Sequence, residues 1–190
     1  MEGGLAQTNN VGANLNVLAF NYSGASPSIV TQAETEASRI FSQSGIRLAW
    51  TNCAAQPNLV SLPVCLGEPT PGQIRVRILD RQLNNAFQDS VFGFAIAPVF
   101  ASVYYESSLR LAQTSTNSES DVSTILGCVI AHEVGHLLLG HNHHTVNGIM
   151  QGRWEIKQIQ QLTAGSLAFT PEQSKLMLVN VHLRISAAVR

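Results

Sequence analysis

Apolar residues alternate with polar ones, or dominate, in five short stretches of the chain, and this pattern is typical of β-strands. The stretches are residues 16–22, 46–50, 74–79, 92–97 and 102–105. A helical pattern joins the first two, which predicts a parallel pair with a right-handed crossover. The connection between the last two is short, and Gly93 and Pro98 accompany the fourth, so we expect that strand to be antiparallel and at the edge of the sheet.

Three other stretches carry apolar residues at helical spacing. The first follows Ser26, an N-cap residue with a proline next to it, and ends at Gly45. The second covers residues 120–140 and is apolar on most sides, which indicates a long buried helix that ends at a glycine. The third begins with Thr170 and Gln173, the two members of a capping box, and extends to about residue 186.

These elements predict one α+β domain over residues 1–190. It contains a mixed, twisted sheet of five strands with an antiparallel edge strand, a crossover helix, a long central helix and a C-terminal helix. A chain of 190 residues, of which 45% are hydrophobic, agrees with one sizeable core. We expect residues 1–14 to form a flexible N-terminal segment.

The charge balance argues against several classes of partner. Eleven Lys and Arg residues against twelve Asp and Glu residues leave a net charge of −1, without a block of like charge. Neither nucleic acid nor membrane is therefore expected as a partner. No stretch approaches the roughly 18 uninterrupted apolar residues of a membrane span, and the first ten residues lack the basic and apolar regions of a signal peptide.

The three cysteines differ in their surroundings. Cys53 and Cys65 bracket a polar loop that contains prolines, whereas Cys128 lies within the apolar pattern of the central helix. We predict a disulfide between Cys53 and Cys65, which implies an oxidising compartment and a secreted or periplasmic protein. The alternative is a cytosolic protein in which both loop cysteines are reduced. Cys128 is expected to be a buried thiol and not a metal ligand.

His132, Glu133 and His136 form an HExxH motif in the second half of the predicted central helix. Residues four apart lie above one another on one helical face, so the two imidazoles can bind the same metal ion. Catalytic zinc takes three protein ligands and leaves a position to water, so a third ligand is required. The alternative is that hydrogen bonds alone satisfy these side chains, but burying them unpaired in an apolar helix would cost on the order of several kcal/mol.

The run HEVGHLLLG, the histidines after it and the later GIM resemble the metzincin zinc peptidases. The order of elements is similar to that of the matrixin-type catalytic domain, and runs such as FSQSGIRLAW and GIMQGRW resemble uncharacterised bacterial metzincin-like proteins. The resemblance implies zinc as the cofactor and Met150 packed beneath the metal in a Met-turn. It also implies that Glu133 is the general base that activates a zinc-bound water and then donates the proton to the leaving amine.

Three residues are candidates for the third zinc ligand: His141, His143 and His144. In metzincins the motif reads HExxHxxGxxH, whereas here the glycine, Gly140, comes one residue later. His144 is preferred, because the bacterial proteins that the chain resembles place a histidine four residues after this glycine and six before the methionine. His143 is the main alternative, because it keeps the family's spacing between glycine and histidine.

The predicted site therefore consists of His132, His136 and His144 as zinc ligands and Glu133 as the catalytic residue. These residues predict a zinc-dependent peptidase, an endopeptidase that hydrolyses peptide bonds of a polypeptide substrate and acts as a monomer.

Two other interpretations are open. The first is a gluzincin-type zinc hydrolase, in which the third ligand is a glutamate on a later helix, either Glu155 or Glu172. The second is a zinc-stabilised binding module without proteolytic activity, against which the intact Glu133 argues. His182, isolated in the last helix, is expected to be a core or surface residue.

Substrate binding is predicted at the edge strand. If residues 92–97 are an exposed edge beside the central helix, their unpaired N–H and C=O groups can pair with an extended peptide. Arg153 and Trp154 follow the predicted Met-turn and are candidates for the wall of the pocket that receives the residue after the scissile bond. Simple packing is the alternative role for both residues.

Overall fold

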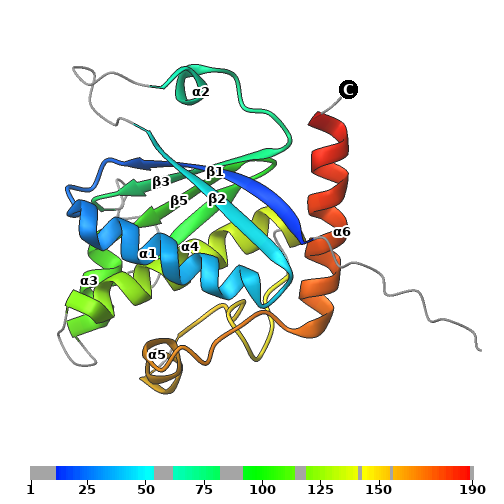
Figure 1. The fold of residues 1–190 in the computed structure, drawn as a ribbon. Helices are drawn as coiled ribbons and strands as arrows, with labels where there is room; N and C mark the ends of the chain where they lie inside the picture. The colour runs from blue at the N-terminus through cyan, green and yellow to red at the C-terminus, as the bar shows by residue number, and fades with distance from the viewer. Residues whose placement is uncertain are drawn as a thin grey trace, which may run out of the picture.

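The computed structural model describes residues 12–53, 62–81, 92–113, 119–140, 143–154 and 156–188. Its centre is a five-stranded sheet in the order β2-β1-β3-β5-β4 (Figure 1). The strands are β1 (Ala13–Asn21), β2 (Ile46–Cys53), β3 (Gln73–Leu79), β4 (Gly93–Ile96) and β5 (Phe100–Tyr104). All neighbouring pairs are parallel except β4 and β5. The predicted mixed sheet with an antiparallel edge strand is confirmed.

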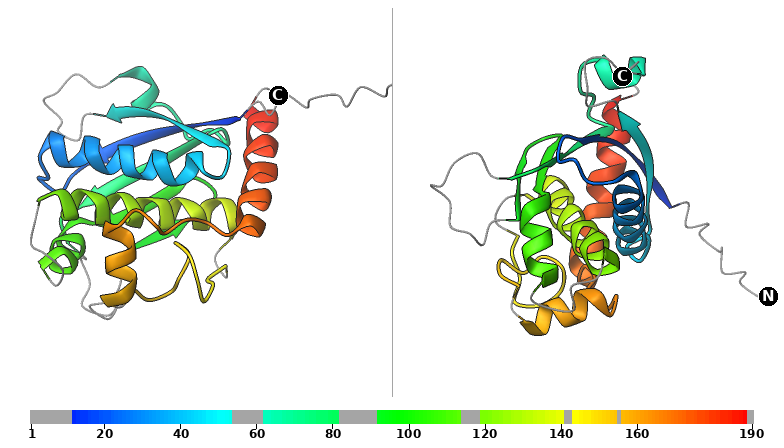
Figure 2. Two further views of the ribbon diagram at one scale, coloured as in Figure 1. Left: turned by 60° about the horizontal axis from the view of Figure 1, so that its bottom comes forward. Right: turned by 90° about the vertical axis from the view of Figure 1, so that its left-hand side faces the viewer.

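The helices of the described residues are α1 (Pro27–Ser42), α2 (Pro63–Leu66), α3 (Tyr105–Gln113), α4 (Glu119–Leu139), α5 (Ile156–Thr163) and α6 (Pro171–Ala188). α1 connects β1 to β2 as the predicted crossover helix. α1 and α4 lie side by side against one face of the sheet, α2 lies beyond the opposite face, and α6 crosses one end (Figure 1, Figure 2). α4 is therefore the central helix of the domain.

The helix ends follow the predicted capping residues. Ser26 Oγ accepts a hydrogen bond from the N–H of Ile29 at 3.3 Å, which satisfies one free donor at the start of α1. Thr170 and Gln173 form a reciprocal capping box at the start of α6, with N···O distances of 2.9 and 3.2 Å. α4 ends at Gly140, whose φ of 100° lies in the region that favours glycine.

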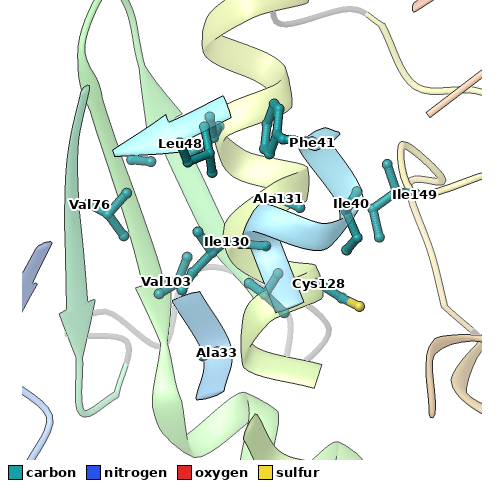
Figure 3. Close-up of a cluster of buried hydrophobic side chains, with 14 of the residues drawn as sticks. Ala33, Ile40, Phe41, Leu48, Val76, Val103, Cys128, Ile130, Ala131 and Ile149 are labelled. Atoms are coloured by element: carbon teal, nitrogen blue, oxygen red, sulfur yellow. The ribbon is translucent and has the colours of Figure 1, made fainter. Parts of the chain in front are cut away.

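The core lies between the sheet and the helices α1 and α4. Inward-facing strand residues such as Leu48, Val76 and Val103 pack against Ile40 of α1 and Ile130 of α4 (Figure 3). Each fully buried side chain of this kind contributes roughly 1.5–3 kcal/mol to folding. This apolar layer holds α4 in a fixed position against the sheet.

Polar side chains of α6 bind the C-terminal end of α4. Asn180 Nδ2 donates to the carbonyl oxygen of Leu138 at 2.6 Å, and Arg184 Nη2 donates to that of Leu137 at 2.8 Å. The last carbonyl groups of a helix have no partner within the helix, so these bonds satisfy two of them. Arg184 also donates to the carbonyl oxygen of Pro98 at 2.5 Å, between β4 and β5. α6 thus connects the end of α4 to the turn at the sheet edge.

Two predictions about the elements are corrected, and three short helices were not predicted. The N-terminal segment was expected to reach residue 14, but Ala13 is buried and pairs with Ile46, so β1 begins there. Tyr105, expected at the end of a strand, is the first residue of α3, which follows β5 without a loop. The helices α2, α3 and α5 have only 4, 9 and 8 residues, and helices this short give no extended periodic signal in the sequence.

The predicted disulfide between Cys53 and Cys65 is confirmed, with a Cα–Cα distance of 5.7 Å. It joins the end of β2 to α2, and both cysteines pack with Leu18 in a small apolar cluster separate from the main core. Cys128 is buried and free, as expected. The compartment of the protein stays a prediction.

One helix in the described part of the chain is long and apolar enough to cross a membrane. It is the stretch Asp121–Leu139 of α4, with a mean hydropathy of 1.6. Inside the domain 89% of this window is buried, as is usual for the central helix of a folded core.

Candidate metal centre

Two histidines of α4 lie next to each other in the candidate metal centre. His132 and His136 lie one helical turn apart, and their Nε2 atoms are 3.1 Å from each other. Their rings meet edge to face, with centroids 4.8 Å apart. The helix alone therefore brings two nitrogen donors to one point, as the HExxH spacing predicted.

His144 brings a third nitrogen to the same point from outside the helix. Its Nε2 lies 3.0 Å from Nε2 of His136, and the donor atoms of His132, His136 and His144 all lie within 4.8 Å of one another. His143 is not part of this group in the described residues, since its ring lies beside Gly140. His141 lies outside the described residues. Of the two described candidates, the structure thus places His144 with the helical pair.

The other nitrogens of the helical pair face backbone carbonyl groups. His132 Nδ1 is 2.8 Å from the carbonyl oxygen of Ile149, and His136 Nδ1 is 3.3 Å from that of Gly140. A proton on each Nδ1 can be donated to these oxygens, which leaves both Nε2 atoms free to bind a metal. Burial lowers the pKa of His132 to about 4, so its imidazole is neutral at pH 7, as a ligand must be.

The donor set fits zinc. Three neutral imidazoles suit zinc among the common metal ions, and three protein ligands leave one position open for water or substrate. Nitrogens that bind one zinc at about 2.0–2.1 Å in tetrahedral geometry lie roughly 3.3 Å from one another. Two of the observed Nε2···Nε2 distances, 3.0 and 3.1 Å, are close to this value.

Met150 packs directly against the helix that carries the motif. Its side chain is fully buried, and a methyl group added to Gly135 would lie only 2.6 Å from Met150 Sδ and 2.9 Å from Phe169 Cε1. Gly135 is therefore the residue of the motif that lets these side chains approach. Met150 lies next to Ile149, whose carbonyl group faces His132. The turn that contains both residues therefore packs against the part of α4 that carries the histidines.

Glu133 lies under the edge strand. A methyl group on Gly93, the first residue of β4, would lie 2.8 Å from Glu133 Cγ and 3.0 Å from Oε1. The strand can pass this close to the carboxyl group only because position 93 has no side chain. Burial raises the pKa of Glu133 to about 8. A divalent cation at the three histidines would favour the ionised form.

A cavity of about 380 Å³ opens over these residues. β4 and Phe92 form one wall, α4 forms the floor, and residues 151–154 form the other wall together with His144. Trp154 meets His132 edge to face at 5.6 Å and stacks on Phe92 at 5.4 Å. Arg153 and Trp154 thus line the cavity, as the sequence suggested.

The remaining candidates lie elsewhere. Glu172, one possible third ligand of a gluzincin, is at the exposed start of α6 and is not in the group of three histidines. Glu155, the other possibility, lies outside the described residues. His182 is exposed on α6, and Cys128 Sγ lies 3.8 Å from Glu36 Oε1 between α4 and α1.

The sequence indicated Gly93 only as a mark of an edge strand and did not single out Gly135, although both glycines allow the close packing of the site. The only signal for them was a glycine inside a helical motif and another within a strand, and both can mark a close approach.

Two of the solved structures with a similar fold come from Methanocorpusculum labreanum and Methanopyrus kandleri. No family model matches the chain, and no curated protein sequence matches it. A zinc-dependent peptidase from Methanocorpusculum labreanum superposes with a TM-score of 0.62 at 14% sequence identity, over 85% of this chain and 99% of that one. Archaemetzincin from Methanopyrus kandleri superposes with a TM-score of 0.54 at 18% identity, over 94% of this chain and 99% of that one. At these identities the likeness shows the fold, and the matrixin-like detail stays a prediction.

Proposed function

We propose that this protein is a zinc-dependent peptidase in which His132, His136 and His144 hold the metal. The observation that carries the proposal is the convergence of three Nε2 atoms in an open cavity that Glu133 also lines. The solved structures with a similar fold, described as a zinc-dependent peptidase and an archaemetzincin, support it.

When bound, zinc supplies a Lewis acid that polarises the scissile carbonyl group and lowers the pKa of water. Glu133 takes the proton from the attacking water and passes it to the amine that leaves. Its place under Gly93 keeps the carboxyl group out of bulk solvent. Phe92 of one wall and Trp154 of the other stack on each other, and this apolar pair contacts the neighbouring substrate residue.

The substrate is an extended polypeptide that pairs with β4 and is cut internally. In the described residues β4 has a neighbour on one side only, β5. The N–H of Tyr104 donates to the carbonyl oxygen of Phe92 at 2.8 Å, and antiparallel strands alternate between paired and outward-facing residues. The backbone N–H and C=O groups of Gly93 and Ala95 therefore point away from β5, toward the side of the cavity, where an extended peptide can form hydrogen bonds with them.

The deciding experiment combines metal analysis with a cleavage assay. Purified protein is expected to contain one zinc per chain and to cut fluorescently labelled, unfolded casein at internal bonds. Glu133→Gln should keep the zinc and lose about 10²–10⁴-fold of the cleavage rate, the usual contribution of a general base. If the wild-type protein and the variant both bind zinc and neither cleaves, the protein is a zinc-stabilised binding module instead.

We also propose that the protein works in an oxidising compartment, as a secreted or periplasmic enzyme. The disulfide between Cys53 and Cys65 supports this proposal, because such bonds are rare in reducing compartments.

A further inference from the structure

The third histidine has a different kind of support from the other two. His132 and His136 belong to α4 and have backbone carbonyl groups at Nδ1, whereas His144 is exposed and lies outside any helix. Within the part of the chain that the structure describes, no hydrogen bond holds its Nδ1. The position of the His144 ring therefore depends on how its backbone is held.

Thr145 holds that backbone. Its N–H donates to the carbonyl oxygen of Met150 at 2.9 Å, which closes the segment between His144 and Met150 into a loop. Its hydroxyl donates to the carbonyl oxygen of Asn147 at 2.7 Å. The same hydroxyl accepts a hydrogen bond from Gln173 Nε2 at 3.4 Å.

Both polar atoms of the Gln173 side-chain amide form hydrogen bonds. Its oxygen accepts from the N–H of Thr170 at 2.9 Å, within the capping box of α6, while its nitrogen reaches Thr145. The side chain is only 6% exposed, so an amide without these partners would lack hydrogen bonds in a buried place. One buried amide thus joins the start of α6 to the residue next to His144.

We propose that Gln173 is a positioning residue for His144, and that α6 thereby contributes to the zinc affinity of the site. This inference rests on the proposed function. Substitution of an outer-shell residue that orients a metal ligand usually lowers the metal affinity by about 10–100-fold. Because Gln173 acts through a neighbouring residue, we expect its substitution to lower the zinc affinity by about tenfold.

Gln173→Glu separates the two roles of this side chain. A glutamate keeps the oxygen that caps Thr170, but it has no N–H to donate to Thr145. Zinc affinity, measured by competition with a chromogenic chelator, is expected to fall about tenfold. The absorption bands of the cobalt-substituted protein should shift as well, because they report the geometry of the ligands.

Two variants of Thr145 test the other end of the hydrogen bond. Thr145→Val removes the hydroxyl and should lower zinc affinity as Gln173→Glu does, whereas Thr145→Ser keeps the hydroxyl and should bind zinc like the wild type. The double variant Thr145→Val/Gln173→Glu should bind zinc no more weakly than the worse single variant, because both changes break one contact.

Thr170→Ala is the matched control, because it weakens the cap of α6 and leaves the Gln173 amide in place. It should lower the melting temperature and leave the zinc affinity and the cobalt spectrum unchanged. Zinc affinity that is unchanged in Gln173→Glu and Thr145→Val, or that falls equally in Thr170→Ala, would overturn the inference. Wild-type protein without zinc would instead contradict the proposed function itself.

Discussion

The two regions that build the site differ in what determines their geometry. In α4, residues 132–136 are held by a regular helix whose inner face is packed against the sheet, so the spacing of the two histidines follows from helical geometry alone. In residues 143–150 the backbone is irregular, and it is held by contacts with Ala168 and with the start of α6. The first region is a local feature of the sequence, and the second exists only after distant parts of the chain have packed together.

The largest expected effect is in the helical region. His132→Ala or His136→Ala should abolish zinc binding, because each change breaks the pair of ligands that one helix holds together and leaves one helical histidine with the exposed His144. Elemental analysis after dialysis checks this result. Zinc retained at one equivalent in either variant would show that the helical pair is not the metal site.

The next effect separates the candidates in the irregular region. His144→Ala should weaken zinc binding more than about 100-fold, beyond the range of an outer-shell change. His143→Ala, one residue away, should bind zinc like the wild type and serves as the control. Equal zinc affinity in the two variants would remove His144 from the ligand set and would favour Glu155.

A substitution at the contact between the two regions should have an intermediate effect. Gly135→Ala places a methyl group where Met150 and Phe169 pack, and overpacking of this kind costs about 1–3 kcal/mol. We expect a lower free energy of unfolding in urea and a weaker affinity for zinc. A variant as stable as the wild type would mean that the turn that carries Met150 moves freely with respect to α4.

The edge strand β4 lies outside both regions, so a substitution there should lower the cleavage rate without lowering the zinc content. Ala95→Pro removes one N–H that points away from β5, so kcat/KM should fall roughly five- to tenfold while zinc is retained. Ile96→Pro is the comparison, because the N–H of Ile96 faces β5 and its loss should lower stability instead. Cleavage at the wild-type rate by both folded variants would mean that β4 does not bind the substrate.

The smallest effect on the site is expected from the disulfide. Replacing Cys53 and Cys65 by serine should lower the free energy of unfolding by about 3 kcal/mol, since the bond closes a short loop. Zinc affinity should not change, because the disulfide lies on the opposite face of the sheet from α4. Mass spectrometry of the unreduced protein provides the check that Cys53 and Cys65 are paired.

What the sequence could predict follows the same division. The strands of the sheet, the crossover helix and α4 were predictable, because periodicity and capping residues are local signals. The preference for His144 over His143 came from a family resemblance, because no local rule specifies a turn that depends on Gln173 and Ala168. The helices α2, α3 and α5 were missed, since short helices are stabilised by tertiary contacts more than by their own pattern.

The hydrogen bonds between α6 and the last carbonyl groups of α4 have a consequence for biosynthesis. A ribosome makes the chain from the N-terminus, so the motif helix emerges before the residues of α6 that complete its C-terminal end. Until Asn180 and Arg184 have been added, those carbonyl groups can accept hydrogen bonds only from water. The segment that carries His144 also lacks the contact between Thr145 and Gln173 of α6. From the synthesis of residue 144 until α6 has been made, the nascent chain therefore carries the three histidines without the contacts that hold the last of them in place.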